Sequence, residues 1–266
     1  MKSYKIIIPS YKRPDTIIKK TLKCLYETDI AKDIYVFVAN EDEEKIYNEK
    51  LKDYEDITVV KGVRGIPNHR NFIQRYFDEG EYLVFIDDDI KSLKGMNKQG
   101  KIVKCTAIHE FVQKAFQQAE GLKFKMWGIN STISNLEMKQ TVSVGLIYIV
   151  GNFYGLINTS EVFVDEGEEI KARANFSAGK ESHERALKMY DKYGGVLKYR
   201  AFGVLSNYWG EEGGHQESRN NEGEKQATEY LHNKYKLLTN MRIYKGYYDL
   251  QIRARTKVYK TNFLQP

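Results

Sequence analysis

The sequence predicts an α/β fold in which helices flank a mostly parallel sheet, with antiparallel strands added in the second half. Three observations predict it. In residues 1–90, short apolar runs rich in β-branched residues alternate with stretches whose apolar residues recur at helical spacing. Each intervening stretch is long enough to return the chain to a parallel neighbouring strand. Residues 96–266 mix strand and helix patterns in no regular order, which favours antiparallel additions.

Four apolar runs in the first half are expected to form the parallel strands. The first run ends at Pro9, and the fourth ends directly in three aspartates. Helices are expected between them, and Asp15 is expected to cap the first one. A glycine-rich loop, residues 61–67, precedes the third helix. The expected strands are residues 5–8, 34–39, 57–60 and 82–86, and the later two helices are residues 41–52 and 68–77.

The second half is expected to contain further helices and strands, joined to the first half in one domain. No internal repeat or low-complexity linker separates the two halves, residues 1–95 and 96–266. Gly194 and Gly195 are expected to end a helix. The expected helices are residues 106–119, 180–193 and 224–238, and the expected strands are residues 125–129 and 142–150. Residues 207–223 are expected to form a loop, and residues 252–260 are a basic tail.

Composition excludes several classes of protein. With 41% hydrophobic and 29% charged residues the chain is not wholly disordered, and 4 prolines with 20 glycines exclude a collagen-like chain. The weakly charged residues 142–157 are too few to span a bilayer, and the first residues lack a signal-peptide pattern, so we expect an intracellular protein with no membrane partner. Two cysteines give neither a disulfide framework nor a zinc site. The net charge of +6 favours an anionic partner.

The three aspartates that follow the fourth strand are the strongest indication of chemistry. In an extended chain Asp87 and Asp89 project to one side and Asp88 to the other. Two carboxylates that converge at the carboxyl end of a parallel strand either raise a pKa or bind a cation. Their hard oxygen ligands select Mg²⁺ or Mn²⁺, at the sheet edge where ligands of α/β proteins bind. The alternative is a solvated acidic turn.

Polar residues after the other three strands are expected at the same sheet edge. Those after the first and third strands suit a phosphate, and those after the second suit a ribose or a uracil base. Capping residues and surface ion pairs are the alternative interpretation. The candidate nucleotide-binding residues are Pro9, Ser10, Tyr11, Arg13, Asn40, Glu41, Arg64 and Arg70, together with Asp87 and Asp88.

Four segments, IIIPSYKRPDTI, VFVANEDE, GVRGIPNHRNF and GEYLVFIDDDI, resemble in this order the nucleotide-sugar half of GT-A fold glycosyltransferases. Arg70-Asn71 and Asp87-x-Asp89 match motif positions of the family-2-type enzymes. The residues of these segments resemble the TET-associated glycosyltransferases of phages more closely still. Residues 179–199 continue this resemblance.

The resemblance implies transfer of a sugar from a UDP-sugar, with Mn²⁺ or Mg²⁺, to the hydroxyl of a hydroxymethylated pyrimidine in phage DNA. It implies that residues 1–95 bind the nucleotide-sugar, that residues 96–266 bind the acceptor, and that the protein works in the cytoplasm of an infected bacterium. Lys12, Arg13 and the tail residues Arg253, Arg255 and Lys257 are candidates for contacts to the DNA backbone. A glycan acceptor and a non-catalytic nucleic-acid-binding protein are the rival interpretations.

The resemblance also points to the catalytic base, and here the chain departs from the family pattern. Inverting family-2-type enzymes carry Glu-Asp at the start of a late helix, where the aspartate is the general base. This chain has Glu181-Ser182, and a serine is no substitute for that aspartate. Glu181 is therefore the first candidate base, followed by Glu184 and His183, and the stereochemistry stays open.

A glycine-rich segment, residues 208–215, has the composition of a lid over the site. Trp209 is placed to cover a sugar or a base, and His215 is a candidate third metal ligand.

Overall fold

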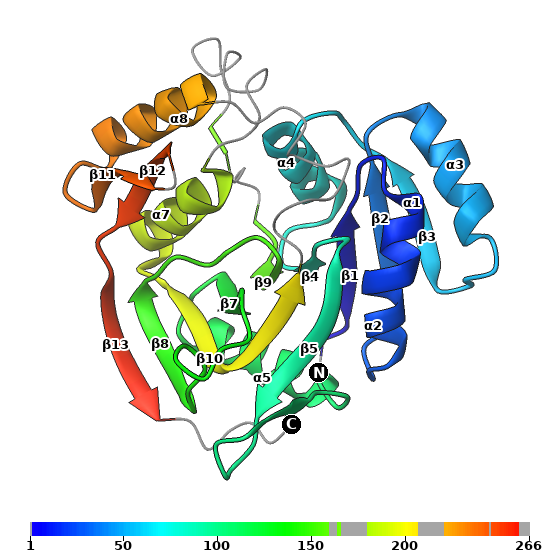
Figure 1. Cartoon of the computed structure of the whole chain (residues 1–266), viewed down its shortest axis with the longest axis horizontal. Coiled ribbons are helices and arrows are strands. Elements are labelled where there is room, and N and C mark those ends of the chain that lie inside the picture. Colours follow the sequence, from blue (N-terminus) through cyan, green and yellow to red (C-terminus); the bar gives the residue numbers. More distant parts are fainter. Residues whose placement is uncertain (1, 160–163, 166–179, 207–220, 245, 261–266) are drawn as a thin grey trace.

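The computed structural model describes residues 2–159, 164–165, 180–206, 221–244 and 246–260. An eleven-stranded sheet runs through this part of the chain, and helices cover both of its faces (Figure 1). Strand order along the main path is β13-β8-β10-β7-β9-β4-β1-β2-β3. The predicted α/β architecture, a large parallel sheet with added antiparallel strands, is confirmed.

The first half forms the parallel part of the sheet. All four predicted strands are present: β1 (Tyr4–Pro9), β2 (Ile34–Val38), β3 (Ile57–Lys61) and β4 (Tyr82–Ile86). β1 lies between β2 and β4 and is parallel to both. Side chains alternate along a strand, so β1 supplies both faces: Ile6 and Ile8 enter one apolar core, and Ile7 enters a second core on the other face.

Helices of the first half pack on both faces. A continuous helical stretch of α1 (Pro14–Ile17), the π-helical η1 (Ile18–Leu22) and α2 (Lys23–Tyr26) shares one core with α3 (Glu41–Leu51), whereas α4 (Ile66–Tyr76) packs into the other. The prediction that Asp15 caps the first helix is wrong, because the helix begins at Pro14 and Asp15 lies in its first turn. Proline suits this position because the first helical residues need no hydrogen-bonded N–H.

The second half extends the sheet beyond β4 with the two predicted strands, now β7 and β8, and with strands that were not predicted. It begins with β5 (Ile90–Met96), β6 (Ile102–Lys104) and α5 (His109–Gly121), then β7 (Met126–Asn130), β8 (Thr141–Leu146), β9 (Phe153–Ile157) and β10 (Val196–Ser206). β9 is antiparallel to both β4 and β7, so it joins the two halves. A side chain at Gly155 would collide with the indole of Trp127, which packs across β9.

A small third layer lies beside the second half. It consists of α7 (Glu181–Tyr193), α8 (Asn221–Lys234) and the hairpin of β11 (Thr239–Tyr244) and β12 (Tyr247–Ile252), with its own apolar cluster around Leu231. Gly194, at φ 79°, ends α7 as predicted. The edge strand β13 (Arg255–Lys260) follows and pairs with β8.

Several element predictions for the second half are corrected. The predicted strand 142–150 ends at Leu146, the helix predicted to reach residue 238 ends at Lys234, and the basic tail forms strands β12 and β13. Residues 221–223 of the predicted loop belong to α8, and residues 207–220 lie outside the described part. Among described residues, no helix combines the length and the apolar character needed to cross a membrane.

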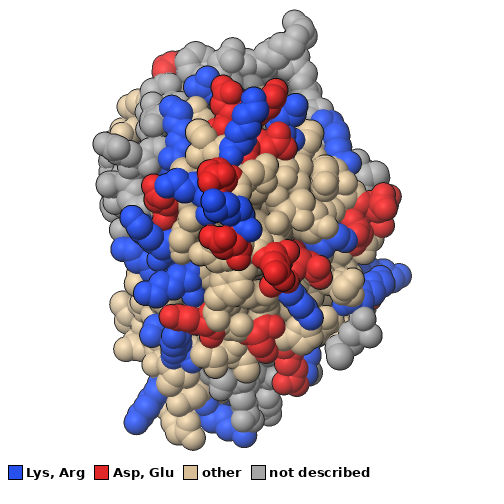
Figure 2. All heavy atoms as spheres, turned by 90° about the vertical axis from the view of Figure 1, so that its right-hand side faces the viewer, with Lys and Arg blue, Asp and Glu red and all other residues tan. Residues whose placement is uncertain are grey.

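The outer face formed by α3 and β3 carries charges of both signs. Figure 2 shows Lys and Arg interspersed with Asp and Glu across this face. Ion pairs join Lys45 to Glu41 and Lys52 to Glu49 on α3 and just after it. This face therefore presents no field of a single sign to a polyanion.

Candidate functional site

The carboxyl ends of β1, β2 and β4 bring the predicted site residues to one edge of the sheet. β1 is in register with β2 up to Pro9 and with β4 up to Ile7, and the N–H of Ser10 donates to the carbonyl of Phe37 at 2.9 Å. The segments that follow these strands therefore lie together, as expected for the carboxyl edge of an α/β sheet.

Asp88 faces the segment that follows β1. The Ser10 hydroxyl donates to Asp88 Oδ2 at 2.6 Å, and Arg13 Nη1 lies 3.1 Å from Asp88 Oδ1. The Asp88 side chain is 8% exposed and that of Arg13 is 10% exposed. Asp88 therefore ties Arg13 and Ser10 to the end of β4.

Asp87 faces α4 and α7 instead. Arg70 Nη2 donates to Asp87 Oδ1 at 3.2 Å, and the Asp87 side chain remains 39% exposed. Burial raises the pKa of Asp87 to about 7, Arg70 opposes this, and the negative charges of Asp89, Asp88 and Glu181 add to it. Repulsion among these carboxylates favours a bound cation at this edge.

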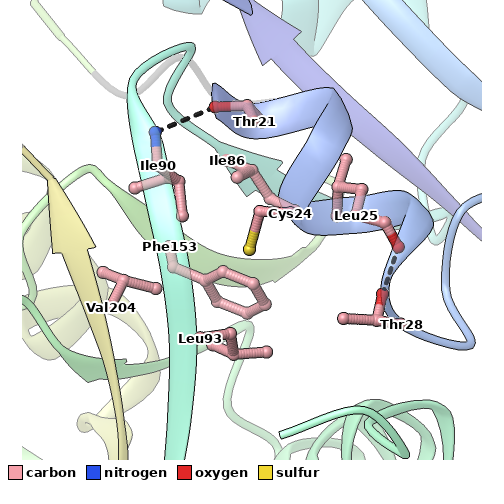
Figure 3. A pocket seen from close by; sticks show the side chains of 9 residues that line it. All are labelled: Thr21, Cys24, Leu25, Thr28, Ile86, Ile90, Leu93, Phe153 and Val204. Atoms are coloured by element: carbon pink, nitrogen blue, oxygen red, sulfur yellow. Dashed lines mark hydrogen bonds between the residues drawn. The ribbon is translucent and has the colours of Figure 1, made fainter. Parts of the chain in front are cut away.

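Thr21 fixes the turn that carries the aspartates, and sequence reasoning missed it. Its buried hydroxyl donates to the carbonyl of Asp87 at 2.7 Å and accepts from the N–H of Ile90 at 2.9 Å. Figure 3 shows the Thr21–Ile90 bond above a small apolar cavity lined by Cys24, Leu93 and other core side chains. A single hydroxyl inside an amphipathic helix gives no sequence pattern that marks this role.

Two residues of α3 shape the segment after β1 and were also missed. The hydroxyl of Tyr47 accepts from the N–H of Arg13 at 2.9 Å and lies 2.7 Å from Ser10 Oγ. Glu43 accepts from the N–H of Lys12 at 2.7 Å and from that of Ala39 at 3.1 Å. Lys12 has φ 55°, a left-handed conformation that is uncommon for lysine. The two α3 side chains stabilise this turn, and their spacing of four residues places them on one face of the helix, which is the sequence signal for this pair.

The predicted residues after β2 and β3 have other surroundings. The side chain of Asn40 caps α3 by accepting from the N–H of Glu43 at 3.0 Å, and Glu41 is exposed and pairs with Lys45. After β3, the guanidinium of Arg64 lies 5.9 Å from the ring of Tyr11. Tyr11 and Arg64 thus form one wall at the edge of the site.

Arg70 is a buried cation of the site. It is 4% exposed, and its guanidinium lies 5.3 Å from the ring of Phe85 and 5.8 Å from that of Tyr154. Arg70 Nε lies 4.0 Å from Glu181 Oε1. The Arg70 guanidinium therefore lies between Asp87 and Glu181, where it neutralises part of their charge.

Glu181 is the one of the three candidate bases that adjoins Asp87. Arg185 Nη1 donates to Glu181 Oε2 at 3.1 Å, and the Ser182 hydroxyl donates to Oε1 at 3.1 Å. Arg185 in turn lies 4.0 Å from the ring of Tyr154. These contacts fix one face of the Glu181 carboxylate, whose side chain is 10% exposed.

The other two candidate bases lie in other surroundings. Glu184 is fully buried and accepts from the N–H of Asp165 at 2.8 Å. The His183 ring stacks on Tyr148 with centroids 4.1 Å apart, and burial together with the charge of Lys180 lowers its pKa to about 3. His183 is therefore neutral near pH 7. Trp209 and His215 lie outside the described residues.

The donor set at the aspartates fits a divalent cation that keeps waters or phosphate oxygens. Within the described ranges, no group of three or more His, Cys, Asp or Glu side chains could hold a metal ion. Asp87 and Asp89 interact as like charges, and Mg²⁺ or Mn²⁺ commonly binds through one or two carboxylates plus substrate oxygens. These two aspartates therefore suit a cation that is also bound by the phosphate oxygens of a substrate.

The basic tail lies on another part of the molecule. Arg255 and Lys257 belong to β13 at the outer edge of the sheet, and Arg253 donates to Asn240 Oδ1 at 2.9 Å. The strand order separates β13 from β4 by four other strands.

The sequence matches the family model described as TET-Associated Glycosyltransferase over residues 4–156, more than half of the chain. No sequence among curated proteins matches. Solved structures with similarity include S. aureus TarS 1-349, at 14% identity and TM-score 0.46, covering 77% of this chain and 60% of that one. The mannosyltransferase PcManGT from Pyrobaculum calidifontis, in complex with GDP-Man and Mn2+, has 15% identity and TM-score 0.48, covering 76% of this chain and 56% of that one. The chain thus spans less than two thirds of either protein.

Proposed function

Because the chain belongs to the TET-associated glycosyltransferase family, we propose that this glycosyltransferase moves a sugar from a UDP-sugar to the hydroxyl of a 5-hydroxymethylpyrimidine in DNA. The base would be hydroxymethylcytosine or hydroxymethyluracil, in phage DNA. The observation that carries the proposal is the position of Asp87 beside Asp89, Arg70 and Glu181 at the carboxyl edge of the sheet. A metal-bound donor at this edge is what a GT-A glycosyltransferase requires.

The donor end of the site is assigned to the aspartates. Asp87 and Asp89 would hold Mn²⁺ or Mg²⁺, which supplies charge neutralisation for the departing nucleoside diphosphate. Asp88 holds Arg13 at the edge of the site through an ion pair of 3.1 Å. Arg13 and the wall of Tyr11 and Arg64 would then contact the nucleotide. Pre-positioning these groups lowers the entropy that must be lost in the transition state.

Glu181 is assigned as the general base for the acceptor hydroxyl. Its carboxylate adjoins Asp87 across Arg70, and Arg185 fixes its orientation. A carboxylate held within reach of the acceptor hydroxyl removes the proton as the oxygen attacks the anomeric carbon. Glu184 and His183 are the second choices, since their side chains are engaged with Asp165 and Tyr148.

The test is a transfer assay with a panel of UDP-sugars, Mn²⁺ and DNA that contains hydroxymethylcytosine or hydroxymethyluracil. The DNA is digested to nucleosides, which are analysed by mass spectrometry. We expect a mass increase of one glycosyl residue, lost in Asp89→Asn and reduced roughly 10²–10⁴-fold in Glu181→Gln. The matched control is Glu49→Gln, which changes an exposed residue of α3 that pairs with Lys52.

Two outcomes contradict this proposal and identify its rivals. Transfer to oligosaccharides but to none of the DNA substrates would assign a glycan acceptor to the same fold. Salt-sensitive DNA binding without binding or hydrolysis of any UDP-sugar would indicate a non-catalytic nucleic-acid-binding protein.

A further inference from the structure

Two cations on β10, Lys198 and Arg200, are half-buried. Neither forms an ion pair with a residue that the structure describes, and Glu137 acts on Lys198 only as a nearby negative charge. The cations around α7 differ, because Lys180 pairs with Glu224 at 2.7 Å and Arg185 pairs with Glu181 at 3.1 Å. A half-buried charge that is only partly neutralised costs free energy, and a bound anion would lower this cost.

The two cations face the same side of the sheet and repel each other. Residues two apart in a strand project from the same face. The Lys198 ammonium donates to the carbonyl of Tyr148 at 3.4 Å. Burial lowers the pKa of Lys198, Glu137 opposes this, and the charge of Arg200 lowers it further. The strand therefore presents two neighbouring donors whose charges an anion would compensate.

These cations lie on the sheet face that carries the candidate base. Lys198 is in register with Gly128 of β7, which is in register with Tyr154 of β9. Two strand spacings therefore separate the Cα atoms of Lys198 and Tyr154, roughly 10 Å. Tyr154 stacks against Phe85 and contacts both Arg70 and Arg185.

A second set of contacts links Lys198 to α7. Lys198 donates to Tyr148, whose ring stacks on His183 in the first turn of α7. Glu181 is two residues before His183, and its charge helps to raise the pKa of Tyr148 after burial. The two cations are thus one layer of side chains away from the proposed base, on residues of the second half.

We propose that Lys198 and Arg200 bind a phosphate group of the acceptor and so orient the acceptor hydroxyl towards Glu181. Two adjacent cationic donors match a tetrahedral anion that accepts several hydrogen bonds. The acceptor's phosphodiester is the assigned source because the donor's diphosphate belongs at Asp87 and Asp89. This assignment rests on the proposed function, in which the acceptor is DNA.

The test compares Lys198→Gln, Arg200→Gln and the double variant with wild-type protein. The measurements are the KM for a hydroxymethylated oligonucleotide at several salt concentrations, the KM for the UDP-sugar, and hydrolysis of the UDP-sugar without acceptor. The control is Lys45→Gln/Lys52→Gln, which removes the same net charge from the outer face of α3. Circular dichroism and thermal melting check that each variant is folded.

We expect the double variant to raise the KM for the oligonucleotide roughly tenfold to hundredfold. The slope of log KM against log salt should fall by about 0.7–0.9, the value for one phosphate. Hydrolysis of the UDP-sugar and its KM should stay at the wild-type value. An unchanged acceptor KM and salt slope would overturn the inference. A raised KM for the UDP-sugar would also overturn it, because the phosphate would then be the donor's.

A second arm is independent of the DNA acceptor. Inorganic phosphate should raise the melting temperature of wild-type protein more than that of the double variant, because a ligand stabilises the state that binds it. Equal shifts in both proteins would overturn the site. If wild type transfers sugar to no DNA but shows this difference in phosphate binding, the proposed function fails and the anion site stands.

Discussion

Thr21 shows how one hydroxyl can stabilise both the fold and the site. It bridges the carbonyl of Asp87 and the N–H of Ile90, at the two ends of the aspartate turn. In Thr21→Val the buried N–H of Ile90 loses its partner, so we expect the free energy of unfolding to fall by about 1–3 kcal/mol. We also expect weaker Mn²⁺-dependent sugar transfer, because the turn is no longer fixed. Urea denaturation and the transfer assay measure the two effects.

Thr28→Val is the matched control for this prediction. Thr28 lines the same cavity, and its hydroxyl donates to the carbonyl of Leu25 at 2.6 Å, away from the aspartates (Figure 3). Its substitution should leave transfer at the wild-type rate. Equal losses of transfer in the two variants would show that Thr21 has no special role at the turn.

Asp87 gives the unfolding free energy a pH dependence of defined sign. Its pKa is about 7 in the folded protein and about 3.9 for an unfolded chain. Between these values the folded state holds a proton that the unfolded state has lost, so stability falls as the pH rises from about 4 to about 7. The 39% exposure of the side chain should keep the slope below the limit of about 1.4 kcal/mol per pH unit.

Denaturation of wild type and Asp87→Asn between pH 5 and pH 8 tests this dependence. The wild-type curve should fall relative to the variant as the pH rises, since asparagine does not ionise. Mn²⁺ at pH 8 should restore stability to wild type and have less effect on the variant. Parallel curves for the two proteins would show that the Asp87 carboxyl is not held protonated.

At the scale of single residues, the sequence predicted that side chains after β1 and β4 lie at one edge of the sheet, but it did not predict how they are oriented, and Asn40 and Glu41 have other partners. The alternation of side chains along a strand predicted that Asp88 points away from Asp87 and Asp89. It did not predict the hydrogen bond from Ser10 to Asp88, because the chain leaves the strand conformation after Ile86. The contacts of Arg70 depend on rings from β4 and β9, which lie far apart in the sequence. Local patterns contain no information about such contacts.

At the scale of elements, a buried ion network joins α7, α8 and β12. The Lys180 ammonium lies 2.7 Å from Glu224 and 3.3 Å from Asp249, and the Lys180 and Glu224 side chains are 6% and 3% exposed. Lys180→Met removes the ion pair of buried Glu224 with Lys180, so we expect a loss of about 3–5 kcal/mol in the free energy of unfolding. Lys180→Met/Glu224→Met should recover much of this loss, because no unpaired charge remains at that pair.

A double-mutant cycle in urea measures the coupling. The exposed pair of Lys45 and Glu41 on α3 is the control, and its cycle should give less than about 1 kcal/mol. Coupling energies of similar size at the two pairs would show that burial does not strengthen the interaction of Lys180 with Glu224.

Strands with a strong local sequence pattern were predicted. Strands that depend on contacts with distant parts of the chain were not. β1, β2, β3 and β4 are apolar runs between clear turns, so their existence and order followed from the sequence. β9 was missed because residues 153–157 lie within a weakly charged run with several glycines. Gly155 is required there by Trp127 on the neighbouring strand β7, a contact that a single sequence does not reveal.

At the scale of the whole molecule, β9 makes the two halves interdependent. β9 comes from the second half, yet it pairs with β4 over five residues in register from Tyr82 to Ile86. Every residue of β4 is buried. A chain cut after residue 105 would expose the backbone groups and apolar side chains of β4 at a new edge, which favours aggregation. The sequence predicted one domain from the lack of a linker, and the pairing of β9 with β4 provides a way to test that prediction.

We therefore expect the chain to unfold in one transition and the fragment 1–105 to fail to fold alone. For the whole chain, far-UV circular dichroism and tryptophan fluorescence should give coincident curves in urea, because Trp127 packs across β9 at the junction of the halves. The fragment should aggregate or give a poorly dispersed NMR spectrum. A soluble monomeric fragment with a dispersed spectrum, or two separate transitions in the whole chain, would show that the half formed by β1 to β4 is an independent domain. That result would also show that the site forms without β9. Arg70 would then hold Asp87 in place without its contact with the Tyr154 ring of β9.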